Sequence, residues 1–297
     1  RMKVNHSMHG FMAMPPLFYL FGSCLLIATF SSFTFASDSL DDANFLSSEI
    51  VLRLTNGENV EAHWISSIDL GEGDFSWTGQ LMKASAGFVT FAKVDDMVSG
   101  SIHFSNGRAY SFRGQGRQPE IKQVISKKLP CGGCLIQKDL PSDPRRNRRT
   151  KTWRNGDGNL IDLLIVYPSS VATAAGGLSL LEADAVKAVA DANLCYRNSR
   201  VNLQLRLVHF SEVNYNETGD LETNLARLEN PNDGYMDNVH DLRDQYGADL
   251  VAMLATESSS GGLANTMMYP SLDFASQGFS VSVWDQIGAP SYTLAHE

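Results

Sequence analysis

Two hydrophobic patterns divide this chain. From Glu49 to Arg113, apolar residues alternate with polar ones in short runs, which is the two-residue period of β-strands. From Leu160 onward, longer apolar runs are separated by segments in which apolar residues recur at helical spacing. We therefore expect a small antiparallel β-rich domain, followed by an α/β domain with a mostly parallel twisted sheet.

Asn-Gly pairs mark two hairpins in the β-rich region. Asn56-Gly57 and Asn106-Gly107 each separate two runs with strand character. A two-residue type I′ turn needs positive φ at both central positions, which Asn and Gly tolerate. We expect such a turn at each pair.

The α/β region begins with a strand that is apolar along nearly its whole length. Leu160–Tyr167 is typical of a strand covered on both faces. Ser179 and Glu182 form a capping-box pattern at the start of a long amphipathic helix. Further on, Gly261–Ala264 is predicted to be a short edge strand, and Ser291 is a candidate cap for a final helix.

A segment rich in Pro, Gly and Arg connects the two regions. It covers residues 130–158 and carries the basic cluster Arg145–Arg149. Such a stretch is exposed and easily cut, so the cluster fits a processing site for a protease that reads paired basic residues. A solvated basic linker explains the cluster equally well.

The first residues have the pattern of an export signal. Arg1 and Lys3 precede an apolar run from Leu17 to Phe30, and Thr34–Ala36 fits a cleavage site. The run is shorter than the about 20 residues of a comfortable membrane span, although an uncleaved anchor is the alternative. We expect residues 1–36 to be removed, leaving a secreted protein that is extracellular or periplasmic.

Composition and charge narrow the function further. The chain is 43% hydrophobic and 19% charged, which indicates folded domains rather than disorder. Residues 150–297 contain 8 Lys/Arg and 19 Asp/Glu, a balance of −11. So acidic a region repels phosphate backbones, and we expect no nucleic-acid partner. No later apolar run approaches the length of a membrane span, so stable membrane insertion is not expected.

The candidate chemistry is concentrated at the end of the sequence. Ser291–Glu297 ends in His296-Glu297, the first two letters of an HExxH zinc helix. In such a helix the histidines bind zinc and the glutamate takes a proton from water. A lone His-Glu pair is common by chance, so it needs support from the sequence before it.

The segments before that pair occur in the order and spacing of a known family. The region from about Asn159 to Glu297 resembles the metzincin zinc proteases, and within them the reprolysin-like branch that contains peptidyl-Asp metalloendopeptidases. The segments that carry the resemblance are Ile161–Tyr167, Asn198-Ser199, Asp233–Asp237, Leu242–Leu250, Gly262–Ala264, Phe279–Val281 and Tyr292–Glu297.

The resemblance implies zinc as the cofactor and roles for individual residues. His296 corresponds to the first zinc ligand and Glu297 to the general base. Gly262, Leu263 and Ala264 correspond to the edge strand that pairs with an extended peptide substrate. Metzincins continue as HExxHxxGxxH, so we expect this sequence to stop inside the motif and to be inactive by itself.

The resemblance also implies latency. The β-rich region, residues 37–129, has the position of a propeptide, and residues 159–297 that of the first part of the catalytic domain. Cys131 or Cys134 in the connecting segment could be a thiol that occupies zinc in the zymogen. A Cys131–Cys134 disulfide is the alternative. Cys195 is either a buried free thiol or the partner of a later cysteine.

Two functions follow from these observations. The first is a secreted zinc endopeptidase precursor, with protein or peptide substrates and its own propeptide as partners. The alternative is an exported, non-catalytic binding or adhesion protein built on a degenerate protease fold. Residues after Glu297 would separate the two, because only the protease needs further zinc ligands there.

Overall fold

A computed structural model gives the fold of the chain. It describes residues 33–35, 48–82, 86–116, 119–124, 134–135, 159–256, 258–267 and 271–297. Most of the predicted export signal and most of the predicted connecting segment, Cys131 and the basic cluster included, lie outside these residues. Within the predicted signal, Phe33–Phe35 forms strand β1, which pairs antiparallel with β2.

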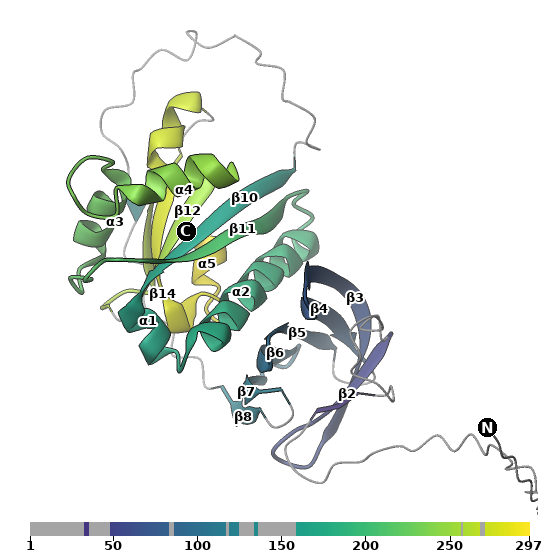
Figure 1. The fold of residues 1–297 in the computed structure, drawn as a ribbon. Helices are drawn as coiled ribbons and strands as arrows, with labels where there is room; N and C mark the ends of the chain where they lie inside the picture. The colour runs from purple at the N-terminus through teal and green to yellow at the C-terminus, as the bar shows by residue number, and fades with distance from the viewer. Residues whose placement is uncertain are drawn as a thin grey trace, which may run out of the picture.

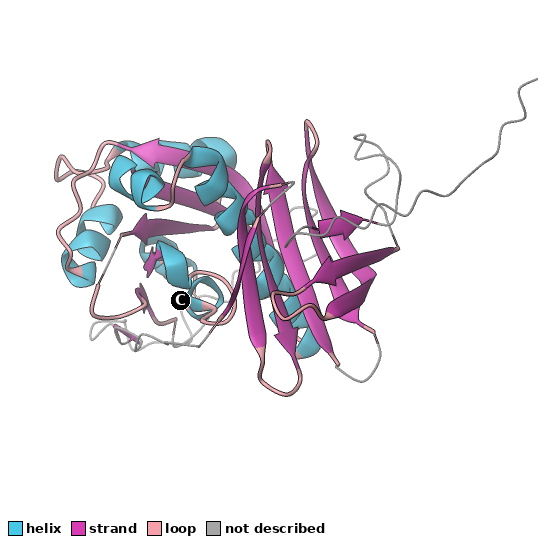
Figure 2. Cartoon of the chain, turned by 90° about the horizontal axis from the view of Figure 1, so that it is seen from below, coloured by secondary structure: helices cyan, strands magenta, loops and turns pink. Residues whose placement is uncertain are grey.

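The first sheet is an antiparallel meander in which the order in space is the order in sequence, from β1 to β8. We call its strands β2 to β8 the N-terminal sheet (Figure 2). They are β2 (Glu49–Arg53), β3 (Asn59–Gly71), β4 (Asp74–Leu81), β5 (Gly87–Val94), β6 (Met97–Phe104), β7 (Ala109–Gln115) and β8 (Glu120–Gln123). Trp77, Phe91 and Phe112 lie in a buried cluster on one face, and the Trp77 and Phe91 rings stack at 5.5 Å.

Both Asn-Gly hairpins form, but the predicted turn type is wrong. Gly57 and Gly107 have φ of 84° and 85°, whereas neither Asn56 nor Asn106 has a positive φ. The Gly57 N–H donates to the carbonyl of Leu54 at 2.9 Å. This is a type I turn followed by a left-handed glycine, the usual three-residue alternative to type I′. Each Asn instead uses its side-chain oxygen to accept the N–H two residues on, at 3.0 Å.

The second sheet belongs to the α/β region and is mixed. Its order is β11-β10-β12-β14-β13-β9, and only the β13–β14 pairing is antiparallel. Its strands are β9 (Cys134–Leu135), β10 (Leu160–Pro168), β11 (Gln204–Val213), β12 (Leu250–Ala255), β13 (Gly262–Asn265) and β14 (Phe279–Val283). The helices are α1 (Ser169–Ala174), α2 (Leu178–Asn198), α3 (Leu221–Glu229), α4 (Asn238–Tyr246) and α5 (Thr293–His296), with 3-10 turns η1 (Leu272–Gln277) and η2 (Trp284–Gln286).

Helix α2 lies between the two sheets (Figure 1). It begins at Leu178 after Gly177, and no side chain caps it. The predicted capping box is therefore wrong, because the Ser179 hydroxyl donates instead to the Asp95 carboxylate of the N-terminal sheet, at 2.6 Å. A contact between distant segments has replaced the local one.

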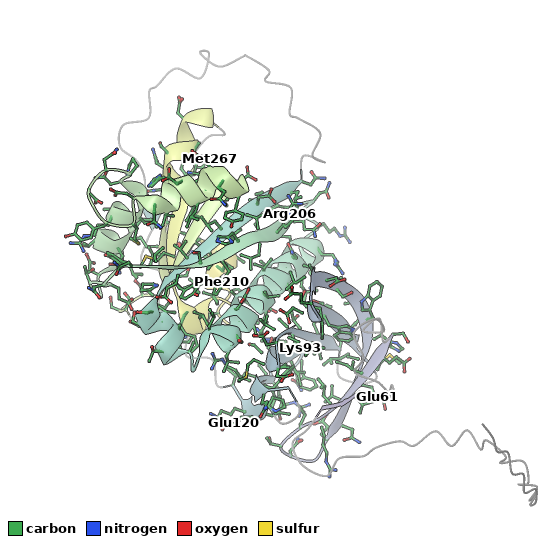
Figure 3. The ribbon with its side chains drawn as sticks, viewed as in Figure 1. Glu61, Lys93, Glu120, Arg206, Phe210 and Met267 are labelled. Atoms are coloured by element: carbon green, nitrogen blue, oxygen red, sulfur yellow. The ribbon has the colours of Figure 1, made fainter. Side chains whose placement is uncertain are left out.

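Two apolar layers enclose the α/β sheet. One face packs against α3 and α4 through a cluster that includes Leu225, Val239 and Met253. The other face packs against α1, α2 and α5. Figure 3 labels Arg206 and Phe210 of β11. Arg206 forms a bidentate ion pair with Asp162 at 2.7 Å, and Phe210 stacks on Tyr167. Among the described residues, no helix combines the length and apolar character that a membrane crossing needs.

Candidate functional site

The last helix places His296 and Glu297 beneath the α/β sheet. Helix α5 is one turn long, and the His296 and Glu297 N–H groups donate to carbonyls four residues earlier, at 3.0 and 2.9 Å. Leu294 is buried in the same cluster as residues of β10, β12 and α2. The helix is therefore anchored by its apolar side, with His296 exposed and Glu297 half-buried.

Glu297 lies directly against strand β13. A methyl group added to Gly262 would come within 2.7 Å of Glu297 Oε1 and 2.6 Å of Thr293 Cγ2. Only a glycine lets the carboxylate and the strand approach so closely. Burial raises the pKa of Glu297, and the neighbouring His296 opposes that shift. A glutamate with a raised pKa at the edge of a cavity is suited to proton transfer.

The ligands for a metal are incomplete among the described residues. A catalytic zinc needs three protein ligands, and here one imidazole, His296, lies beside one carboxylate. No group of three His, Cys, Asp or Glu side chains gathers anywhere in the described ranges. The chemistry of His296 suits zinc, but this donor set alone does not make a zinc site.

A cavity of about 160 Å³ lies next to α5. His296 and Glu297 line it together with Ala264 and Asn265 of β13. Apolar side chains form much of the remaining wall, among them Leu163, Tyr196, Leu205 and Phe279. The candidate residues thus share a hollow with the end of the strand that was predicted to bind substrate.

Strand β13 is paired on both of its sides. β14 is its antiparallel neighbour, and β9 from the connecting segment pairs with it in parallel. The register places Cys134 opposite Ala264 and Leu135 opposite Asn265. The structure therefore brings the backbone of one predicted latency cysteine to the predicted substrate strand.

Sequence reasoning missed the residues that hold α5 in place. Asp191 on α2 is 2% exposed and accepts from Lys187 Nζ at 2.6 Å and from the Ala289 N–H at 2.9 Å. Gly288 lies against this ion pair, and its carbonyl accepts the Tyr292 N–H at 2.8 Å. Lys187 and Asp191 are four residues apart, a spacing that predicts only a surface ion pair. Nothing in the sequence indicated the loop docked on them.

Tyr292 links this loop to the N-terminal sheet. It has a left-handed backbone, with φ of 57°, and replaces the predicted Ser291 as the residue before α5. The Ser291 hydroxyl donates to Gln286 Oε1 instead, at 2.7 Å. The ring of His103 on β6 lies 6.2 Å from the Tyr292 ring. Cys195 is a partly buried thiol that forms no disulfide, and it is hydrogen-bonded with the Tyr292 hydroxyl. Burial raises the pKa of the Cys195 thiol.

Sequence reasoning also missed a second polar contact, at the C-terminal end of β13. Asn265 Nδ2 donates to Glu229 Oε1 at the end of α3 and lies 3.4 Å from the Gln277 carbonyl oxygen. Burial raises the pKa of Glu229, and the bond from Asn265 opposes that shift. This contact fixes the end of β13 nearest the cavity.

Comparison with known proteins bears on this geometry. Residues 157–297 match the model of metallo-peptidase family M12. The peptidyl-Asp metalloendopeptidase of Stenotrophomonas maltophilia (strain K279a) is 28% identical over 291 residues, which cover 92% of this chain and 67% of that protein. The namesake from Xanthomonas campestris pv. campestris is 31% identical over 262 residues, covering 82% of this chain and 60% of that protein. The comparisons support a metallopeptidase with endopeptidase activity.

The likeness to these metallopeptidases includes the N-terminal sheet, because an alignment covering 92% of the chain must extend well before residue 157. The chain itself spans only 60–67% of the length of these relatives. Metalloproteinase-II from Bacteroides fragilis, a solved structure, matches over 83% of this chain and 78% of that chain, with 8% identity and a TM-score of 0.46.

Proposed function

We propose that this protein is the precursor of a secreted zinc endopeptidase. The observation that carries the proposal is the placement of His296 and Glu297 at the end of one short helix, with the Glu297 carboxylate against β13. The match of residues 157–297 to metallo-peptidase family M12 supports it. Zinc, when bound, polarises a peptide carbonyl and lowers the pKa of water.

The chain's own residues would have distinct roles in hydrolysis. His296 is exposed on α5 and would contribute one imidazole to the metal site. Glu297 would accept a proton from the attacking water and pass it to the leaving amine. Its raised pKa brings its proton affinity closer to that needed near neutral pH. Strand β13 would hold an extended peptide by main-chain hydrogen bonds.

We infer that residues 1–297 alone bind zinc weakly and cleave nothing, because one imidazole cannot replace three ligands. The missing ligands are expected in the continuation of the HExxHxxGxxH motif. Metal analysis of the 297-residue chain after dialysis tests this. Stoichiometric zinc that survives dialysis would contradict it.

Latency would come from the connecting segment. β9 occupies the side of β13 on which a substrate strand would add, and Cys134 pairs there with Ala264. A peptide cannot use this strand while β9 holds it. Replacing Cys131 and Cys134 by Ser in the protein from the complete gene should raise activity before processing if a thiol contributes. Unchanged latency would assign the block to the β9 backbone alone.

The decisive experiment uses the protein from its complete gene, processed and loaded with zinc. Peptides cleaved beside aspartate are the first substrates to test, because the relatives carry the name peptidyl-Asp metalloendopeptidase. Glu297→Gln should lower kcat by about 10²–10⁴-fold, the usual contribution of a general base, while zinc stays bound. His296→Ala should lose zinc. A Glu297→Gln enzyme with full activity would refute the assignment.

A further inference from the structure

The outward side of α2 is a surface covered by the N-terminal sheet. On its inner side, Leu181 and Ala185 pack beneath the α/β sheet. On its outer side, Ala183 and Val186 form a separate small cluster with Ala92 and Val94 of β5. Lys187 and Ala190 are buried as well, so the helix is enclosed on both long sides. The contact between the halves is thus a layer of small residues, not a shared core of large ones.

The two faces of the N-terminal sheet carry different classes of residue. Its core face carries Trp77, Phe91 and Phe112. The opposite face carries mostly small residues, which are largely buried on β4 to β6, half-buried on β7, and in register across the strands. One row is Ser76–Ala92–Ser99–Arg113, and the next is Thr78–Thr90–Ser101–Ser111. Contacts of β4, β5 and β6 with α2 put α2 on this face.

Arg113 is the main polar link across this surface. Its Nε and Nη2 atoms donate to the Asp184 carboxylate of α2, at 2.9 and 2.6 Å to Oδ2. Nη2 also donates to the Ala175 carbonyl at 2.6 Å, and the guanidinium lies 5.1 Å from the Trp284 ring centre. Side-chain exposures of 32% for Arg113 and 11% for Asp184 mean that water screens this pair only in part.

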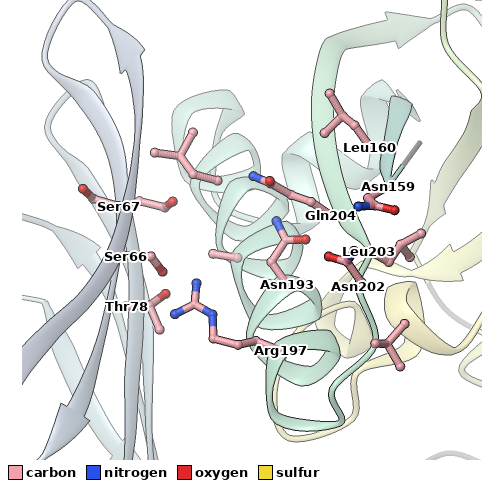
Figure 4. A pocket seen from close by; sticks show the side chains of 14 residues that line it. Ser66, Ser67, Thr78, Asn159, Leu160, Asn193, Arg197, Asn202, Leu203 and Gln204 are labelled. Atoms are coloured by element: carbon pink, nitrogen blue, oxygen red, sulfur yellow. The ribbon is translucent and has the colours of Figure 1, made fainter. Parts of the chain in front are cut away.

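The two ends of the contact are polar. At the start of α2, Ser179 donates to Asp95. At the other end, the helix and the sheet diverge around a pocket of about 470 Å³. Ser66, Ser67 and Thr78 of the sheet face Arg197 of α2 across it (Figure 4). A small apolar centre with a polar, open rim is typical of surfaces between proteins that can separate.

Each half also has its own buried apolar core. The large apolar residues of the N-terminal sheet form one cluster, and those of the α/β half form two others. The buried Lys187–Asp191 pair lies within α2, so it stays paired if the sheet leaves. The family model also covers residues 157–297 without the sheet.

We propose that the N-terminal sheet is a separable partner of the α/β half, and that cutting the connecting segment leaves the two in a non-covalent complex. Its main docking surface is the outer side of α2 together with Trp284, and β9, which stays on the N-terminal side of the cut, adds its pairing with β13. Activation would then need dissociation as a second step after the cut. The meaning of this step rests on the proposed protease function, but the association itself does not require activity.

The test replaces Arg145–Arg149 in the full chain by the recognition sequence of a site-specific protease. After cleavage, gel filtration at neutral pH and about 10 µM protein should give one peak that contains both halves, since interfaces of this kind bind at micromolar or better. Two separate peaks from the cut wild-type protein would overturn the proposal. No outcome depends on zinc or on hydrolysis, so failure of the proposed function would leave the result intact.

Variants of Arg113 test the assigned surface. Arg113→Ala should raise the dissociation constant at least about tenfold, because it leaves Asp184 without its partner. Arg108→Ala is the matched control, since Arg108 pairs with Glu58 inside the N-terminal sheet, at 3.0 Å. The double exchange Arg113→Asp with Asp184→Arg should recover part of the loss. Circular dichroism checks folding, and an Arg113→Ala protein that folds and binds like wild type would remove Arg113 from the surface.

Discussion

The two sheets of this molecule are assembled in opposite ways. In the N-terminal sheet every strand pairs with its neighbours in sequence, from β2 to β8. In the α/β sheet, β10 lies between β11 and β12, and whole helices separate those strands in the chain. Hairpins close short loops, whereas parallel crossovers need helices that return the chain. Local sequence thus determines the first sheet, and tertiary packing determines the second.

The candidate catalytic residues all lie in one of these two halves. His296, Glu297 and β13 all belong to the sheet that depends on distant contacts. The N-terminal sheet contributes neighbours of that site, such as His103 beside Tyr292, but none of the proposed catalytic groups. Because the two sheets are assembled separately, damage to one sheet should leave the other folded.

The strongest test of that independence removes the centre of the N-terminal core. Trp77 is fully buried and stacks on Phe91. Trp77→Ala should destabilise the N-terminal sheet by about 5 kcal/mol, near the top of the range for large core truncations. In urea, followed by circular dichroism, an early transition should appear while the α/β half unfolds near its original midpoint. One transition shifted as a whole would show that the halves unfold together.

The converse test acts on the α/β half. Asp191→Ala leaves Lys187 buried without its partner and removes the acceptor of the Ala289 N–H. The expected loss is about 4 kcal/mol, as for breaking other buried ion pairs, measured by urea unfolding. Asp162→Ala is the control, because its pair with Arg206 is more exposed and should contribute about 1 kcal/mol or less. Equal losses of stability in the two variants would contradict the role of Asp191 as a buried partner of Lys187 and of the Ala289 N–H.

The sequence predicts the elements better than it predicts their contacts. The hairpin at Asn56-Gly57 and the strand at Gly262–Ala264 were located from local pattern alone, and both form. The turn type at Asn56 and the cap at Ser179 were wrong. In both cases the side chain makes a bond that the prediction did not include: Asn56 Oδ1 accepts from the Glu58 N–H, and the Ser179 hydroxyl donates to Asp95.

The candidate site shows the same limit. His296 and Glu297 were found because their chemistry is carried by adjacent residues. Asp191 and Tyr292 were not found, because their contacts join residues about 100 positions apart in sequence or rest on an unusual backbone conformation. The pairing of Cys134 with Ala264 is a register between strands, which short apolar runs leave undetermined.

A smaller loss of stability is expected from a change at the contact between Glu297 and strand β13. Gly262→Ala would force the new methyl group against Glu297 and Thr293, at 2.7 and 2.6 Å. Overpacking of this kind costs about 1–3 kcal/mol, and it should move α5 away from β13. Urea unfolding measures the cost, and a crystal structure of the variant would measure the displacement. Ala264→Gly, two residues along the same strand, controls for a general effect on β13.

The smallest expected effect is a pH dependence at His103, where the two halves meet. Burial lowers the pKa of His103 below 6.5, attraction to Asp191 opposes this, and repulsion from Lys187 adds to it. The folded protein therefore binds fewer protons at this residue than the unfolded chain, and stability should fall as pH drops below 6.5. Among described residues on the neighbouring strands, its register partners are Phe88 and Ala109, which carry no charge.

Glu182 gives the opposite sign at the other end of the same contact. Burial, followed by repulsion from Asp74 and Asp95, raises its pKa above 4.5, so its contribution favours the folded state in acid and fades as pH rises. Comparing wild type with His103→Gln isolates the histidine, because Glu182 is common to both. The urea midpoint of wild type should fall more than that of the variant between about pH 7.5 and pH 5. Parallel profiles would mean that His103 titrates as it does in water and that the contact between the halves does not sense its charge.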